Sequence, residues 1–407
     1  MVDAFSPVTI GPITLRNRFI RSGANEMMTR GGIPTQALLE LHQSLARGGV
    51  GMATLAYVAV SPDGRTFADQ GMINQRALPH YRAVVEAVHE QGAKISAQLT
   101  HAGSFVQHDE LSTRRALSAS AGIDKMGVMR GRVWQQQMTR QDMERVRDEF
   151  VRAAQAAVNA GFDAIELHMG HGYLLNQFIS PLSNKRRDDY GGNAENRARF
   201  PAELLAAVKR EVGGKVAVLA KLNLLDGVPK GAGIAEAIIT AKALEAEGAD
   251  LLVLSAGRNI EASWQIFGSP LPYDDLARMQ SGLFARLQFM LLKMSVPKHI
   301  IFKELYLLDA ARQMRAAVKM DLAYLGGVQS RLAAEQLLNE GFKAVVMARA
   351  LVHDPDIINK FQKNPDYHSG CTACNRCVAA MYGPAGTHCP LVGNALDVRL
   401  QNQPALF

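Results

Sequence analysis

The sequence predicts one (β/α)8 barrel (a TIM barrel) with long strand-end loops and a short cysteine-rich C-terminal extension. Its 407 residues, 48% of them apolar, can bury one large core. Short apolar runs alternate along the chain with longer segments of helical periodicity. Most of these runs are continuously apolar, as expected for parallel strands that helices cover. A doubly wound sheet is the alternative, but the number of strand–helix repeats favours the barrel.

Individual elements follow from local patterns. Thr139 and Asp142 form a capping box, apolar residues at helical spacing follow, and Gly161 ends that helix. Similar patterns predict helices over 35–47 and 78–90. Two long connections, 100–139 and 257–305, follow predicted strands, where barrel proteins place their sites. The predicted strands span 19–22, 50–60, 94–99, 163–168, 216–222, 250–255, 321–325 and 343–348.

Composition excludes several classes of function. The net charge is +7, but basic and acidic residues are interspersed and form no stripe, so nucleic-acid binding is not expected. No apolar stretch approaches the ~18 residues of a membrane span, and the N-terminus carries no signal-peptide pattern. We therefore expect a soluble, cytoplasmic protein that acts on small molecules. Its oligomeric state stays open, a homo-oligomer included.

The stretch 166–178 carries the most informative polar residues, at the C-terminal end of the fourth predicted strand. His168, His171 and Tyr173 can converge on one small acceptor. Imidazoles can donate hydrogen bonds to an oxygen on which negative charge develops, and a tyrosine can deliver a proton. Two partly buried structural histidines are the alternative. A zinc site is weakly supported, because no third ligand lies nearby in the sequence.

Residues 168–173 (HMGHGY) and 176–200 (NQFISPLSNKRRDDYGGNAENRARF) together resemble the old yellow enzyme family. The similarity extends from Ile10 to at least Asp356, nearly the whole barrel. It implies flavin mononucleotide (FMN) across the barrel mouth and reduction of activated alkenes, such as enones and nitroalkenes, with hydride from NAD(P)H. It also implies that His168 and His171 bind the electron-withdrawing group and that Tyr173 donates the proton.

The resemblance also assigns cofactor-binding residues. It implies that Gln98 bonds the flavin pyrimidine edge and that Lys221 is the cation beside flavin N1 and O2. Asn25 stands where many members carry Thr or Cys near flavin O4 and N5, a departure that affects flavin tuning. Loops after the seventh and eighth strands of barrels commonly hold a phosphate. The family's phosphate-binding residues fall there at Gly326, Gly327, Ala348 and Arg349.

All four cysteines lie near the C-terminus, at Cys371, Cys374, Cys377 and Cys389. Three close thiols and a distant fourth beside proline are typical of an iron–sulfur cluster, whereas structural zinc more often uses two separated pairs. The segment resembles the branch containing 2,4-dienoyl-CoA reductase and trimethylamine dehydrogenase, whose barrels hold a [4Fe–4S] cluster. The resemblance implies such a cluster here, with zinc or free thiols as alternatives.

These observations predict an FMN-dependent NAD(P)H oxidoreductase of the ene-reductase type. We expect the FMN-binding barrel over residues 1–360 and the cysteine-bearing extension, packed on the barrel, over 361–407. One alternative is an amine dehydrogenase or demethylase that passes electrons from FMN to the cluster. Two alternatives from other classes are a metal-dependent hydrolase using His168 and His171, and an electron-transfer module without its own substrate.

Overall fold

The computed structural model describes residues 2–278, 290, 293–294, 296–297 and 300–392. Eight parallel strands close into a barrel, since the last strand pairs with the first. This confirms the predicted fold and all eight predicted strands, and it makes the doubly wound alternative wrong, because that sheet stays open. The strands are β3 (Phe19–Arg21), β6 (Met52–Ala59), β7 (Lys94–Thr100), β11 (Ala164–Met169), β12 (Ala217–Asn223), β13 (Leu251–Ser255), β14 (Leu322–Leu325) and β15 (Ala344–Met347).

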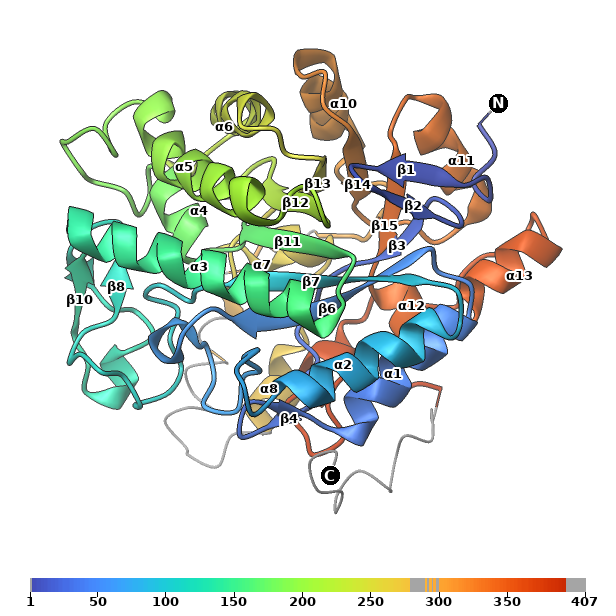
Figure 1. The fold of residues 1–407 in the computed structure, drawn as a ribbon, viewed down its shortest axis with the longest axis horizontal. Coiled ribbons are helices and arrows are strands. Elements are labelled where there is room, and N and C mark those ends of the chain that lie inside the picture. Colours follow the sequence, from blue (N-terminus) through green and yellow to red (C-terminus); the bar gives the residue numbers. More distant parts are fainter. Residues whose placement is uncertain (1, 279–289, 291–292, 295, 298–299, 393–407) are drawn as a thin grey trace.

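Helices cover the outside of the barrel, each packed against the next in chain order from α1 to α3 and from α3 through α5 and α6 to α10 (Figure 1). The Thr139–Asp142 capping box starts α3, and Gly161 ends it with a left-handed φ of 94°, as the sequence predicts. The covering helices are α1 (Gln36–Arg47), α2 (Leu78–His89), α3 (Arg140–Ala160), α5 (Ala194–Val212), α6 (Ile234–Ala246), α10 (Leu308–Ala317) and α11 (Arg331–Asn339).

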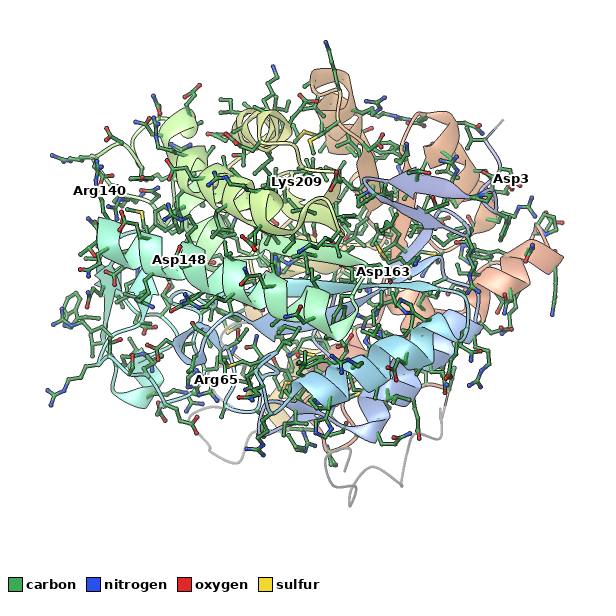
Figure 2. All side chains as sticks on the ribbon, viewed as in Figure 1. Asp3, Arg65, Arg140, Asp148, Asp163 and Lys209 are labelled. Carbon is green, nitrogen blue, oxygen red and sulfur yellow. The ribbon has the colours of Figure 1, made fainter. Side chains whose placement is uncertain are left out.

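A hairpin closes the N-terminal end of the barrel. Strands β1 (Val8–Ile10) and β2 (Ile13–Leu15) pair antiparallel, and their buried side chains pack against residues inside the barrel, such as Leu251. The labelled charged residues Asp3, Asp163 and Lys209 lie on this side of the molecule (Figure 2). Asp163 accepts hydrogen bonds from Lys94 Nζ and the Ile95 N–H, so it joins the starts of two neighbouring strands. The interior of the barrel floor is apolar, and these charged contacts lie around it.

The opposite end, the mouth, is formed by loops and short elements. Part of the 257–305 connection lies outside the described residues. The small elements of the loops are β4 (Thr29–Arg30), β5 (Ile33–Pro34), η1 (Pro62–Gly64), β8 (Leu117–Ser118), β9 (Gly122–Ile123), η2 (Val128–Arg130), β10 (Trp134–Gln137), α4 (Leu174–Ile179), α7 (Ser263–Phe267), α8 (Tyr273–Arg278) and α12 (Arg349–His353).

The C-terminal segment returns to this mouth. Helix α13 (Ile357–Lys363) crosses residue 360, the predicted boundary of the barrel, and α14 (Arg376–Ala380) follows within the cysteine segment. Asn375 Nδ2 donates to Ser269, and Thr387 donates to the carbonyl oxygens of Asn25 and Glu26. Residues 393–407 of the predicted extension lie outside the described residues. Within the described ranges no helix has the length and apolarity needed to cross a bilayer.

Candidate active site at the barrel mouth

A cavity of ≈ 220 Å³ opens at the C-terminal ends of the barrel strands. The strand ends and the loops after them form most of its wall, and residues between 371 and 387 of the C-terminal segment cover one side. Lys221, Gly326, Cys374 and Cys389 do not line it. The other predicted site residues all line this cavity: Asn25, Gln98, His168, His171, Tyr173, Gly327, Ala348, Arg349, Cys371 and Cys377.

Lys221, Gln98 and Glu166 form one buried group at the base of the cavity. Glu166 Oε1 accepts a hydrogen bond from Gln98 Nε2 at 2.5 Å and lies 3.0 Å from Lys221 Nζ. Lys221 Nζ also donates to Ser22 Oγ and to the Gly23 carbonyl oxygen, both at 3.2 Å. Burial lowers the pKa of Lys221, and the adjacent Glu166 carboxylate opposes that shift. Lys221 therefore lies just behind the cavity wall, next to the Glu166 carboxylate.

A second buried ion pair lies at the end of β3. Arg21 Nη1 is 2.6 Å from Glu26 Oε1, and both side chains are 2% exposed. Glu26 also contacts His42 Nε2 at 3.1 Å and accepts a hydrogen bond from the Ala56 N–H. Because Arg21 lines the cavity, two cations lie at its base, each with its own carboxylate. Removing either carboxylate would leave a buried uncompensated charge.

His168 and His171 contact each other at the end of β11. The Gly170 N–H donates to His168 Nδ1 at 3.3 Å, so the proton of this ring lies on Nε2, which faces His171 Nδ1 at 3.3 Å. His171 Nε2 then donates to Ser255 Oγ at 2.7 Å. Burial lowers the pKa of His168, and it lowers the pKa of His171 to about 3, with Lys221 adding to both shifts. Both imidazoles are neutral donors near pH 7.

Tyr173 packs on this histidine pair. Its ring centroid lies 4.6 Å from that of His168, and the rings of Tyr57 and Phe105 pack against it at 5.3 and 5.5 Å. Burial raises the pKa of Tyr173 above its ordinary value, so the phenol keeps its proton at neutral pH. Tyr382, from the C-terminal segment, lines the same cavity, and burial raises its pKa to about 12.

Residues after β14 and β15 form another part of the cavity wall. Gly327 has a φ of +83°, and its N–H donates to no described residue. Arg349 Nη1 donates to Ser269 Oγ at 3.1 Å and to Asn375 Oδ1 at 2.5 Å, and Nη2 donates to the Phe267 carbonyl oxygen. Arg349 is therefore shared between the cavity and the cysteine segment, whereas the sequence predicts a phosphate clamp alone.

Asn25 and Gly326, two further predicted site residues, lie in different surroundings. Asn25 Nδ2 is buried and has no hydrogen-bond partner among the described residues. Gly326 packs on Tyr324, because a Cβ there would lie 2.7 Å from the tyrosine hydroxyl. Asn25 thus offers a free donor to the cavity, and Gly326 has a packing reason to be glycine.

The four cysteines gather around one small cavity with Arg349. They form no disulfide. Burial raises the pKa of Cys371, and it raises the pKa of Cys377 to about 12. Within the described ranges no three His, Cys, Asp or Glu side chains are close enough to hold a single metal ion.

Several residues of this site are absent from the sequence predictions, and Arg21, Tyr57, Glu166 and Ser255 are those that come from the barrel strands themselves. Each lies in or at the end of a predicted strand, the position at which barrels place functional side chains. Arg21 and Glu166 are charged residues inside apolar strands, a signal that would have identified them. Tyr57 lies within a register shift of the strand, between Leu55 and Val58, which the sequence does not reveal.

Comparisons with known proteins give the chain a family. Residues 3–269 match the NADH:flavin oxidoreductase / NADH oxidase family. The 4,4'-dithiodibutanoate disulfide reductase of Rhodococcus erythropolis is 39% identical over 401 residues, which cover 97% of this chain and 96% of the relative. The NADPH dehydrogenase of Bacillus subtilis (strain 168) is 34% identical over 69% of this chain and 81% of its own length.

Solved structures share the fold. The old yellow enzyme homologue from Zymomonas mobilis matches over 100% of both chains with a TM-score of 0.70 and 20% identity. 2-Naphthoyl-CoA reductase matches 97% of this chain with a TM-score of 0.79 and 22% identity. The chain spans only 58% of that reductase, so the likeness concerns the barrel and its extension.

Proposed function

The chain belongs to the NADH:flavin oxidoreductase / NADH oxidase family, and on this premise we propose that it reduces activated C=C bonds with electrons from NAD(P)H. Its cofactor is FMN. The observation that carries the proposal is the neutral histidine pair beside a protonated tyrosine, next to two buried cations. Such a site offers hydrogen-bond donors and a proton to an acceptor that becomes electron-rich.

Unpaired donors along the cavity support the placement of FMN. Asn25 Nδ2, the Gly327 N–H and Arg349 Nε have no partner among the described residues, and all three residues line the cavity. A phosphate would take the donors of Gly327 and Arg349, and the flavin edge those of Asn25 and Gln98. When bound, FMN supplies the two-electron chemistry, accepting hydride from NAD(P)H and passing it to the substrate.

The residues around the cavity prepare the substrate for this hydride. An electron-withdrawing oxygen of the substrate would replace His171 as the acceptor for His168 Nε2–H. It would also compete with Ser255 for His171 Nε2–H. Tyr173 would then deliver its proton to the carbon that carries the developing charge. Lys221 holds a positive charge at the base of the cavity, and Glu166 fixes its position.

A disulfide is a second candidate substrate. It rests on the 39% identity, over nearly the full length of both chains, to a protein named for reducing 4,4'-dithiodibutanoate. A disulfide accepts two electrons as an activated alkene does, and each released thiolate takes one proton. Tyr173 can supply one of these protons.

The remaining alternatives have different standing. Amine oxidation stays a rival within the family, and reduction of the flavin by small amines under anaerobic conditions would reveal it. The metal-dependent hydrolase is wrong, because the family is one of oxidoreductases. In addition, His168 and His171 belong to no metal-holding group within the described ranges.

We further propose that the C-terminal extension begins after α13 and that its four cysteines hold a [4Fe–4S] cluster. The proposal is supported by the four cysteines lining one small cavity, where such a cluster could lie. Iron and acid-labile sulfide in anaerobically purified protein would support this proposal. Zinc without sulfide, or four titratable thiols without metal, would contradict it.

Stopped-flow kinetics test the central proposal. The FMN-loaded protein is reduced anaerobically with NADPH or NADH and then mixed with 2-cyclohexenone, a nitroalkene or 4,4'-dithiodibutanoate. Rapid reoxidation by the alkenes would support ene reduction, and rapid reoxidation by the disulfide alone would favour the second candidate. A reduced protein that none of them reoxidises would overturn both.

A further inference from the structure

A second cavity of ≈ 270 Å³ adjoins the active site. It shares Phe105, His171 and Asn259 with the main cavity, so the two spaces meet beside the histidine pair. Most of its remaining wall comes from the segment 121–125 around β9, from 182–185 and from the 258–261 loop after β13. A substrate anchored at the histidines could therefore extend from one cavity into the other.

The second cavity carries excess positive charge. Arg258, Lys125 and Lys185 line it, and Glu261 is the single carboxylate in its wall. Glu261 is shared, since Arg258 Nε lies 3.0 Å from it and Lys125 Nζ 2.8 Å. Lys185 Nζ contacts only the Pro181 carbonyl oxygen among described groups. Two of the three cations therefore lack a carboxylate of their own.

Arg258 is the buried centre of this wall. Its side chain is 6% exposed, and its Nη1 donates to Asn176 Oδ1 at 2.9 Å, so the guanidinium is fixed. Its Nη2 has no partner among the described residues. This nitrogen lies beside Gly172, where a Cβ would be 3.8 Å away. The neighbouring Asn259 Nδ2 is buried and makes no hydrogen bond of ordinary length among the described residues, but it lies close enough to the Tyr173 hydroxyl to lower the pKa of that phenol. Asp226 lies behind Asn176 and does not line the cavity.

We propose that this second cavity binds a carboxylate on the tail of an elongated substrate whose reacting group lies at His168 and His171. A fixed guanidinium and an amide with free N–H groups suit a carboxylate, which accepts several hydrogen bonds at once. The inference rests on the proposed function, because it places the reacting group at the histidine pair. The substrates expected are acids with several bonds between the carboxylate and the reduced bond.

Binding to the oxidised, FMN-loaded protein tests this without turnover. The probes are 4-(4-hydroxyphenyl)butanoate and its methyl ester, and we expect the phenol of each to bind at the histidine pair. Affinities are read from the flavin spectrum and from calorimetry. We expect the acid to bind about tenfold more tightly than the ester, the scale of one hydrogen bond to a charged group. Arg258→Gln should abolish this preference while leaving the affinity for the ester unchanged.

Further variants keep the test decisive if Arg258→Gln folds poorly. Lys185→Gln should reduce the preference by about threefold, as for an exposed charge. Lys242→Gln, which removes an exposed lysine of α6, should leave it intact. The subsite would be overturned if the acid and the ester bound equally well, or if the two lysine variants had equal effects. A weaker affinity for NADPH in Arg258→Gln would also overturn it. If calorimetry shows Arg258-dependent binding of the acid while the flavin spectrum does not change, that result would support the subsite but contradict the role of the histidines.

Discussion

The two ends of the barrel are built from opposite chemistry. At the floor, the β1–β2 hairpin and the strand starts bury apolar side chains against one another. At the mouth, the strand ends and the residues after them bury two ion pairs, the imidazoles of His101 and His168, and amide nitrogens that have no hydrogen-bond partner among the described residues. Burying polar groups costs free energy unless each is paired. The floor therefore stabilises the fold, whereas the mouth keeps buried polar groups whose free hydrogen-bonding capacity a cofactor and a substrate can take up.

Tyr173→Phe is the strongest test of this division. We expect reoxidation of the reduced enzyme by an enone to slow by about 10²- to 10⁴-fold, the usual contribution of a positioned proton donor. Reduction by NAD(P)H should be nearly unchanged, since it does not use the phenol. Stopped-flow traces separate the two half-reactions. Equal losses in both would show that Tyr173 holds the site together instead of donating a proton.

Leu251→Ala at the floor should have the opposite effect, lowering stability while leaving activity nearly unchanged. Leu251 is fully buried in the floor cluster, so its truncation should lower the free energy of unfolding by about 2–5 kcal/mol. Chemical denaturation measures this loss. Turnover per bound FMN should stay within about twofold of the parent, because the site lies at the opposite strand ends. A large loss of turnover in protein that remains folded would contradict the separation of the two ends.

The sequence predicts the floor and the mouth unequally. Continuous apolar runs specify β12 and β13, because strands buried on both faces need no alternation. Residue type and strand position likewise point to His168 and His171 as site residues, whereas Gln98 is assigned through the family resemblance alone. The sequence does not show which hydrogen-bond partners each of these side chains takes in the folded chain. That Arg349 turns toward Ser269 and Asn375 depends on segments far apart in the chain.

Arg349→Ala should weaken the retention of FMN by about 1.5–3 kcal/mol, the scale of hydrogen bonds to a charged group. Ultrafiltration followed by flavin fluorescence gives the dissociation constant. Because Arg349 also bonds Asn375, the iron content of the variant should be measured alongside. Unchanged FMN affinity with loss of iron would assign Arg349 to the cysteine segment and contradict its phosphate role.

The smallest expected effect concerns pH and the buried His101, which follows β7 near the mouth. Burial lowers the pKa of His101 to about 4, and its Nε2 has no partner among the described residues. Between about pH 6.5 and 4 the unfolded chain binds a proton at this residue and the folded chain does not. Stability then falls as the pH falls, by about 1 kcal/mol between pH 7 and 5.5. Urea unfolding of the parent and of His101→Gln at both pH values isolates this contribution, because the glutamine binds no proton in either state. The variant should lose less stability than the parent on acidification, and identical losses would mean that His101 takes up its proton within the folded mouth.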